Sequence, residues 1–414
     1  MMIQEACYYT LVVPYLLFAF AARREITPNS IFLCFQLVMF IGLKSYIDPE
    51  YSPDNVYLWI YFITALMYVC ATELGGAFRR KAVNKTNVLP MQSITDYQRK
   101  IVFLIIAVGM AVCLLFFATS GVNVFLKSVQ SLLSGSSANY TETRLNNTNA
   151  IGSGYVYQFR VILLPLLVLY LIFFGDKKNK QIGVVLVIPM LIFLLGTGQR
   201  GGFVLAMVSL ILALCYLNMF YKQGNGKKII LICVGAIALF SMLTVYNGRI
   251  IEGQSLFEAV LSRVFDSNQL AATVGFRFII NQPCQWGYDW LMTIMDLLPG
   301  KNSYKDISNT IFAILYGSGR GTAPPCIWGS VYYNFNWIGI VVFPVLLALF
   351  HEYFYYRLVS RPISGLRIVV YSFAFVSLGS WVAGGIMSMF NQGFITICIL
   401  IAILGIDRKE PHNI

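Results

Sequence analysis

The chain has little charge and few of the side chains that bind metals. Asp, Glu, Lys and Arg make up 12% of its 414 residues, and only two residues are His. It contains no Cys-x-x-Cys pair, no HExxH sequence and no GxxxxGKS/T phosphate loop. These absences argue against a tightly bound transition metal and against work driven by ATP, so we expect neither a metal nor a cofactor.

Apolar surface is what the chain has in excess. Hydrophobic residues make up 58% of the sequence, more than a soluble domain of this length needs to fill its core. The net charge of +12 comes from basic residues that separate apolar runs and form no single patch, which argues against a nucleic-acid partner. We therefore predict an all-α polytopic protein that is integral to a membrane.

Apolar runs long enough to cross the hydrocarbon core, about 30 Å, predict roughly eleven transmembrane helices. They lie near residues 6–22, 31–47, 56–75, 101–120, 156–174, 181–197, 203–221, 229–247, 328–350, 368–384 and 394–406.

The positions of the Lys and Arg residues predict the orientation. Most of them fall on one side of the alternating spans, and the positive-inside rule makes that side cytoplasmic, with the N-terminus outside and the C-terminus inside. We predict a membrane domain over 1–247 with an external loop near 121–155, a large external loop over 248–327, and three further spans with a cytoplasmic tail over 328–414. Within the large loop, the apolar spacing of Leu256–Phe265 predicts an amphipathic helix.

The cations on the predicted external face are mostly Arg, whose planar guanidinium holds phosphate oxygens in pairs. Arg200 and Arg320 each lie among glycines that leave the backbone open, so we predict that both bind a diphosphate. The alternative for each is a tight turn whose Arg reaches toward water.

A hydroxyl that must be activated needs a base, and the large loop offers carboxylates. Asp266 and Asp289 each have apolar or aromatic neighbours that would raise the carboxyl pKa toward a useful value. The alternative for either residue is to neutralise a nearby Arg. We keep both as candidate bases.

Three motifs, in this order, are similar to those of a known family. They are the glycine turn Gly198-Gln199-Arg200-Gly201, the loop residues Gly287-Tyr288 and Leu298-Pro299-Gly300, and a segment leading back into the membrane with Pro324, Pro325, Gly329, Tyr333, Asn334, Phe335, Trp337, Ile338 and Gly339. Together with the span pattern, they resemble the Wzy-type O-antigen polymerases over about residues 194–350.

The resemblance implies a metal-independent glycosyltransferase of GT-C-like architecture in the bacterial inner membrane, acting in lipopolysaccharide biosynthesis. Such an enzyme joins oligosaccharide repeat units carried on undecaprenyl diphosphate at the periplasmic face, and a chain-length-regulating copolymerase is its expected partner. Arg200 and Arg320 would then hold a diphosphate. Second-rank candidates for the other diphosphate or for acidic sugar are Arg249, Arg263 and Arg277. Gly329, Tyr332, Tyr333 and Asn334 would form the segment that contacts sugar or leads back into the membrane.

Two positions depart from the family pattern. Many relatives carry an acid after the glycine that corresponds to Gly329, whereas this chain has Ser330, so its base would have to come from elsewhere. Relatives also often have Gly after the Asn-Phe pair, where this chain has Asn336. The alternatives are an O-antigen ligase, which differs in its acceptor, and a lipid-linked oligosaccharide flippase, which should place charged residues inside its spans.

Overall fold

The computed structural model describes the chain except for residues 1–2, 24, 83–93, 120–121, 135–142, 144–145, 148–152, 199–200, 222–225, 228, 236–254, 266–268, 297–303, 319–320, 386–387 and 408–414. Over the described residues the secondary structure is helical and includes no strand. The chain divides into two compact units, each made of several segments of the sequence. The prediction of an all-α protein is confirmed.

Eight of the described helices are long and apolar enough to cross a membrane. They are Ile3–Arg23, Ser52–Arg80, Asp96–Thr119, Gly154–Phe174, Lys177–Leu195, Gly201–Tyr221, Cys326–Val359 and Gly365–Ala383. Each coincides with a predicted span. The predicted spans 31–47 and 394–406 coincide with the shorter apolar helices Pro28–Leu43 and Phe394–Ile403, and the span predicted at 229–247 lies largely outside the described residues.

The first unit comprises Met1–Lys85, Phe257–Tyr356 and Ser377–Gln392. Its elements are α1 (Ile3–Leu17), the π-helix η1 (Phe18–Arg23), α2 (Pro28–Leu43), α3 (Ser52–Ala82), α12 (Leu256–Phe265), α13 (Gln269–Ile279), α14 (Tyr288–Met295), α15 (Ile307–Tyr316), most of α16 (Cys326–Val359), the 3-10 helix η3 (Ser380–Ala383) and α18 (Ser388–Asn391). The helix predicted at Leu256–Phe265 is confirmed as α12.

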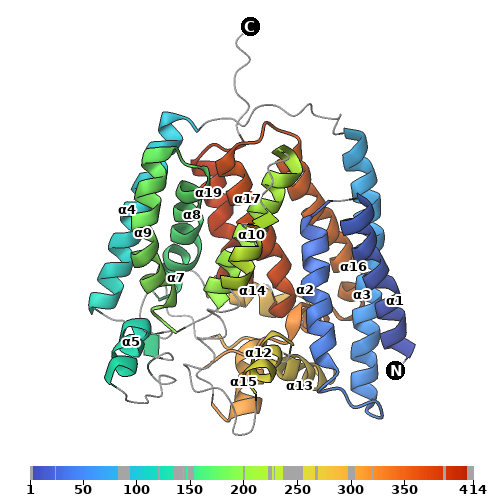
Figure 1. Ribbon diagram of the computed structural model, residues 1–414. Helices are drawn as coiled ribbons and strands as arrows, with labels where there is room; N and C mark the ends of the chain where they lie inside the picture. Colours follow the sequence, from blue (N-terminus) through green and yellow to red (C-terminus); the bar gives the residue numbers. More distant parts are fainter. Residues whose placement is uncertain are drawn as a thin grey trace. The chain divides into compact units, whose positions relative to one another are not determined.

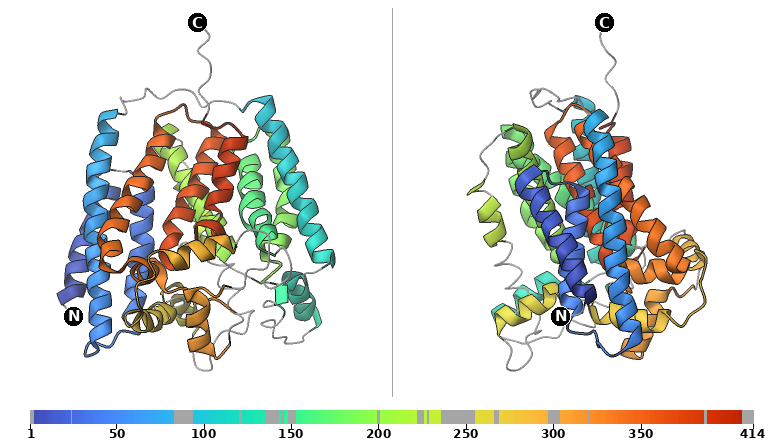
Figure 2. Two further views of the ribbon diagram at one scale, coloured as in Figure 1. Left: turned by 180° about the vertical axis from the view of Figure 1, so that it is seen from behind. Right: turned by 90° about the vertical axis from the view of Figure 1, so that its right-hand side faces the viewer.

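Helices α1, α2 and α3 stand side by side, and α13 lies across the end at which α2 finishes and α3 begins (Figures 1 and 2). Buried polar contacts join α3 to α16 within this unit. The Tyr68 hydroxyl lies 2.6 Å from Nδ1 of His351, and Arg79 pairs with Glu352 at 2.9 Å. The large loop therefore contributes short helices that pack on the end of the spanning helices of this unit.

The second unit comprises Thr86–Leu256, Arg357–Val376 and Gly393–Ile414. Its elements are α4 (Asp96–Thr119), α5 (Val124–Ser134), α7 (Ser153–Tyr157), the π-helix η2 (Gln158–Leu163), α8 (Leu164–Phe174), α9 (Lys177–Leu195), α10 (Gly201–Tyr221), most of α17 (Gly365–Gly379) and α19 (Phe394–Ile403). Helices α8 and α9 form the most extensive pair, and Asp176 caps α9 by accepting a 2.8 Å hydrogen bond from the Asn179 amide.

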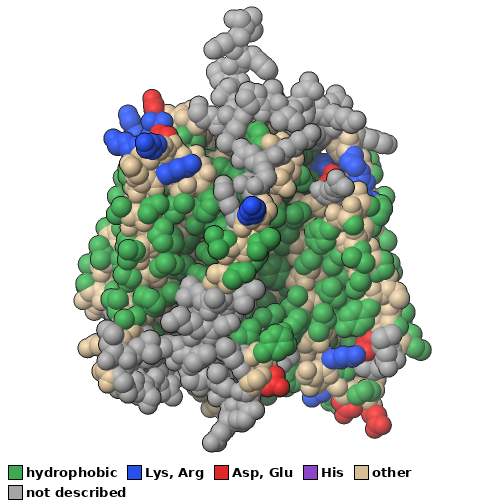
Figure 3. All heavy atoms as spheres, in the orientation of Figure 1, with side chains coloured by type: hydrophobic (Ala, Val, Ile, Leu, Met, Phe, Trp, Pro, Cys, Tyr) green, Lys and Arg blue, Asp and Glu red, His purple; other side chains and the backbone are tan. Residues whose placement is uncertain are grey.

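Exposed apolar side chains are typical of the spanning helices. On the face seen in Figure 3, hydrophobic side chains cover the middle of the helices, whereas charged side chains lie mostly near helix ends. Leu114 and Leu115 on α4, for example, are 60% and 65% exposed. Such surface is unfavourable in water and is satisfied by lipid, so the structure supports a multi-pass membrane protein.

Candidate functional site

A cavity of about 120 Å³ lies within the first unit, between α14, the start of α15 and the start of α16. Carboxyl, hydroxyl and amide groups share its wall with proline and glycine. Its lining residues are Asp289, Trp290, Thr293, Asp306, Ile307, Ser308, Thr322, Pro324, Pro325, Ser330, Gly384, Gly385, Ser388 and Asn391. Of the candidate bases predicted from the sequence, Asp289 is on this wall, whereas Asp266 lies outside the described residues.

Helix α16 is broken at Asn336, which has φ 52° and ψ −147°. That region of the backbone map strongly favours glycine, and Asn tolerates positive φ better than most residues. The Asn336 side chain accepts a 2.8 Å hydrogen bond from the Trp337 amide and so caps the second half of the helix. The first half, which carries Ser330 and Asn334, is therefore a separate short helix with a direction of its own.

The broken end of this first half leaves carbonyl groups that need donors. The Gln285 amide donates to Tyr333 O at 3.0 Å, and the Gly287 amide donates to Asn334 O at 3.2 Å. Gly287 has φ 83°, and a Cβ there would meet the Phe335 ring at 3.2 Å. Two of the sequence motifs, Gly287-Tyr288 and Tyr333-Asn334-Phe335, are thus brought together in one contact, and the glycine is required by its backbone conformation.

Side chains strengthen the same contact. The indole Nε1 of Trp290 donates to Ser330 Oγ at 2.8 Å, and the fully buried Asn334 accepts from the Trp290 amide at 3.3 Å. The Asn334 amide nitrogen donates to Ser330 O at 3.0 Å. The Trp290 ring also packs edge-on against Phe335, with 5.2 Å between ring centroids. These bonds fix α14 against α16 and hold Asp289, the neighbour of Trp290, at the cavity.

Asp289 is 2% exposed, and neutral groups supply its hydrogen bonds. Its Oδ1 accepts from the Tyr304 hydroxyl at 3.0 Å and from the Ile307 amide at 3.1 Å. Burial raises the pKa of Asp289 above the ordinary carboxyl value, and the charge of Asp306 acts in the same direction, while these hydrogen bonds oppose the shift. A raised pKa makes a carboxylate a stronger base than an ordinary one, which suits a group that takes a proton from a hydroxyl.

Asp306 is the second carboxylate of the cavity. It caps α15 by accepting a 2.9 Å hydrogen bond from the Asn309 amide, and burial raises the pKa of Asp306. Since its Oδ1 holds the end of a helix, we assign it a structural role. Asp289 also accepts a hydrogen bond from the first amide of α15, but it is the more buried of the two carboxylates and is the one predicted from the sequence, so we keep Asp289 as the candidate base.

Glycines make room on another wall of the cavity. A Cβ at Gly385 would lie 2.7 Å from Ser330 Oγ, and one at Gly384 would lie 2.7 Å from Ser388 Oγ. This pair was not among the residues predicted from the sequence. Its signal was available, because two adjacent glycines end the apolar run predicted at 368–384.

Three other residues of the segment leading back into the membrane are described but do not line the cavity: Gly329, Tyr332 and Tyr333. A Cβ at Gly329 would lie 3.1 Å from Pro325 Cβ, so this glycine faces the proline closely. The Tyr332 ring meets Phe276 edge-on at 5.4 Å, and Tyr333 packs on a core cluster that contains Ile279 and Ile311. Their contact with sugar stays a prediction.

Arg277 lies on α13, where it contacts a carboxylate of the same unit. Its Nε and Nη2 donate to the two carboxyl oxygens of Asp54 at 2.8 and 2.5 Å, and Nη2 also donates to Tyr46 O at 3.1 Å. The bond to Asp54 raises the pKa of Arg277 further. The geometry gives Arg277 a structural partner, and its predicted role in binding phosphate or acidic sugar stays a prediction.

Arg200, Arg249 and Arg320 lie outside the described residues, and Arg263 is on α12 but its side chain is not described. One buried Arg lies near the predicted turn of Arg200. Arg160 of η2 is 2% exposed and donates to Leu194 O at 2.8 Å, at the end of α9. A cation beside the last carbonyl groups of a helix stabilises it, because this end of the helix dipole is negative. Arg160 is one of the cations on the predicted external face, but it was not predicted as a site residue.

Comparison of the chain with protein-family models, with curated proteins and with solved structures gives no significant match. Its function must therefore be inferred from the residues and their geometry.

Proposed function

We propose that this protein is a metal-independent glycosyltransferase of the O-antigen polymerase type, with Asp289 as its general base. The observation that carries the proposal is the buried Asp289 carboxyl on a cavity whose wall includes Asp289 and Trp290, which follow Gly287-Tyr288, and Ser330, which follows Gly329. These are two of the segments on which the resemblance depends. GT-C-like architecture, a location in the bacterial inner membrane and a periplasmic site belong to the same proposal.

The chemistry follows from a carboxylate base and a diphosphate leaving group. The Asp289 carboxylate takes the proton of an acceptor sugar hydroxyl as that oxygen bonds to the anomeric carbon of the donor. The bond between this carbon and the diphosphate oxygen breaks, and undecaprenyl diphosphate leaves with the electron pair. Arg200 and Arg320 are the residues that we propose to stabilise this developing charge. No metal or nucleotide is needed for the balance of this step.

Both departures from the family pattern are accounted for by this proposal. Where relatives carry an acid after the glycine, this chain has Ser330, and Ser330 lines the same cavity as Asp289. A carboxylate from α14 is thus available close to the position of the missing acid. Where relatives often have glycine, Asn336 has a backbone conformation that favours glycine.

A flippase is the second candidate, and one observation favours it. Arg79, which is 8% exposed, pairs with Glu352 at 2.9 Å and with Glu25 at 2.8 Å, and Arg79 and Glu352 both lie in membrane-spanning helices. Buried ionisable groups in spans are expected along a translocation path. These groups lie toward the ends of α3 and α16, however, and compensate one another's charge, so we rank this function second.

The decisive experiment supplies the purified protein with undecaprenyl-diphosphate repeat units of its own strain in detergent, without metal or nucleotide. A ladder of longer glycans on the lipid is the expected result. A single unit that stays unchanged, with authentic substrate and folded protein, would contradict the proposal. Movement of labelled repeat units across a vesicle membrane without elongation would favour the flippase, and transfer to lipid A core would favour the ligase.

A further inference from the structure

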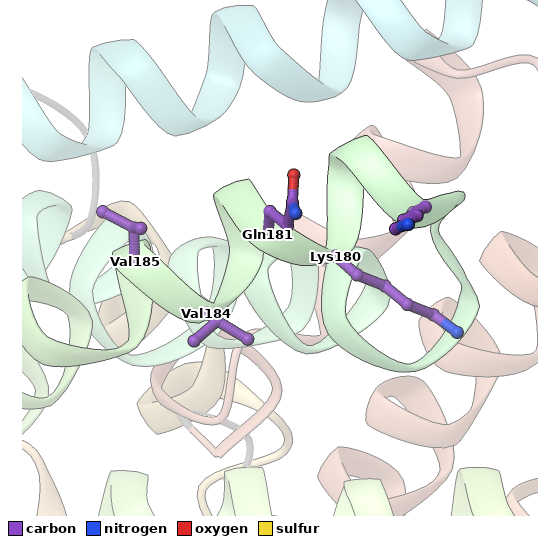
Figure 4. A pocket seen from close by; sticks show the side chains of 5 residues that line it. Lys180, Gln181, Val184 and Val185 are labelled. Carbon is purple, nitrogen blue, oxygen red and sulfur yellow. The ribbon is translucent and has the colours of Figure 1, made fainter.

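An open hollow runs along one side of α9 in the second unit, far in sequence from the residues of the proposed glycosyltransferase site. It is lined by Lys177, Lys180, Gln181, Val184 and Val185 (Figure 4). The spacing i, i+3, i+4, i+7 and i+8 places all five on one face of the helix. Polar and cationic side chains occupy the first turns of this face, and aliphatic side chains follow.

The aliphatic part of this face is strongly exposed. Val184, Val185 and Ile188, which continues the same spacing, are 60%, 72% and 69% exposed. Between Lys177 and Ile188 the helix rises about 16 Å. The hydrocarbon core of a bilayer is about 30 Å thick, so this rise is similar to the thickness of one leaflet. The cationic head and the aliphatic side chains that follow it together span about the length of one lipid molecule in one leaflet, and the aliphatic part from Val184 to Ile188 covers about 6 Å of this.

Charge at the head of the hollow is unbalanced. The first turn of α9 contains no acid, and its lysines oppose the positive end of the helix dipole. Asp176 is engaged as the helix cap, and Asp96 lies 3.8 Å from Arg99 of α4. Helix α8 packs against both α4 and α9, so the charged starts of α4 and α9 belong to one end of the second unit. Figure 3 shows Lys and Arg side chains gathered over these helix ends.

We propose that this α9 face binds an anionic glycerophospholipid. Its phosphate lies against Lys177 and Lys180, and an acyl chain follows Val184, Val185 and Ile188. An anion at this place relieves the repulsion among the lysines and also meets the positive end of α9. The occupant is one lipid molecule of the surrounding leaflet, recognised by headgroup charge and chain together. This inference does not depend on the proposed glycosyltransferase activity.

The test measures lipid retention by the full-length protein in native mass spectrometry. Protein in detergent receives equal amounts of dioleoyl phosphatidylglycerol and dioleoyl phosphatidylcholine, and the wild type is expected to retain the anionic lipid preferentially. The variant K177Q/K180Q should lose about 25-fold in this preference, since each basic residue near the membrane surface contributes about fivefold. The control is K178Q, which removes one charge from the same turn at a residue that does not line the hollow and should stay within about twofold of wild type.

Three outcomes would overturn the proposal. The first is equal preference in K177Q/K180Q and wild type, and the second is an equal loss in K178Q, which would mean diffuse attraction to the whole helix end. The third is full displacement of the lipid by inorganic phosphate, which would mean an anion site without a role for the acyl chain. Because these lysines also contribute to orientation, accessibility of a C-terminal tag in membranes must show that each variant inserts as wild type does.

Discussion

Two buried carboxylates of the first unit are equally hidden but are compensated in different ways. Asp54, 1% exposed, gives both of its oxygens to the guanidinium of Arg277. Asp289, 2% exposed, accepts hydrogen bonds from neutral groups, the Tyr304 hydroxyl and the Ile307 amide. Asp54 is thus paired with a cation, whereas Asp289 has only neutral hydrogen-bond donors in the described part of the chain, and burial raises the pKa of Asp289 beside a cavity. The comparison separates a carboxylate in a structural ion pair from one whose setting suits the proposed role of a base.

The largest expected effect is on elongation in D289N. Loss of a general base typically costs 10²- to 10⁴-fold in rate, so the ladder of products should fall by about that factor. Folding should be retained, because Asn has nearly the same shape and the Asp289 charge has no cationic partner among the described residues. The measurement is the initial rate of repeat-unit addition per folded molecule. The matched control is D296N on the exposed end of the same helix, and equal activity in both variants would exclude Asp289 as the base.

The opposite signature is expected when Asp54 loses its charge. In D54N the Arg277 cation loses its charged partner, which should reduce the free energy of unfolding by about 2 kcal/mol. This is less than the loss expected for a fully buried pair, because the Arg277 side chain is partly exposed. Unfolding in detergent measures this loss, and activity per folded molecule should not change. R277Q then decides between the two roles of Arg277. A tenfold loss of activity in folded R277Q would support the phosphate contact predicted from the sequence.

Eight of the spans predicted from the sequence coincide with helices long enough to cross a membrane, because long apolar runs are local signals. Apolar spacing also predicted α12 correctly as a helix. Asp289, chosen for its apolar neighbours, is buried at the cavity, and its role as a base stays a prediction. What the sequence did not predict is pairing across the chain. Nothing local indicates that Gly287 and Asn334 meet, or that Arg277 pairs with Asp54, since these contacts depend on tertiary packing. The adjacent glycines Gly384 and Gly385 are visible in the sequence, but only the fold shows that they leave space beside Ser330 and Ser388.

A smaller effect is expected at Tyr304, and it concerns pH. The hydrogen bond from Tyr304 lowers the pKa of Asp289 and so opposes burial. A base acts in its deprotonated form, so elongation should rise with pH through the pKa of Asp289. Y304F removes the opposing bond, which should move this rise to higher pH and reduce the rate about threefold on the rising limb of the profile. Rates measured across pH for wild type and Y304F provide the test, and an unchanged midpoint would mean that Tyr304 does not act through Asp289.

The smallest effect is expected at Asn336, whose φ of 52° sets the direction of the half-helix that carries Ser330 and Asn334. N336G relieves the backbone but loses the bond to the Trp337 amide, so the free energy of unfolding should rise by no more than about 1 kcal/mol, with elongation retained. N336A keeps the strain, loses the same bond, and should be destabilised by about 1 kcal/mol. Unfolding of both variants in detergent measures the difference. Equal stability of the two variants would mean that the strained backbone at Asn336 does not set the direction of the half-helix that carries Ser330 and Asn334. The position of Asp289 at the cavity would then need another explanation, whereas the ion pair of Asp54 would be unaffected.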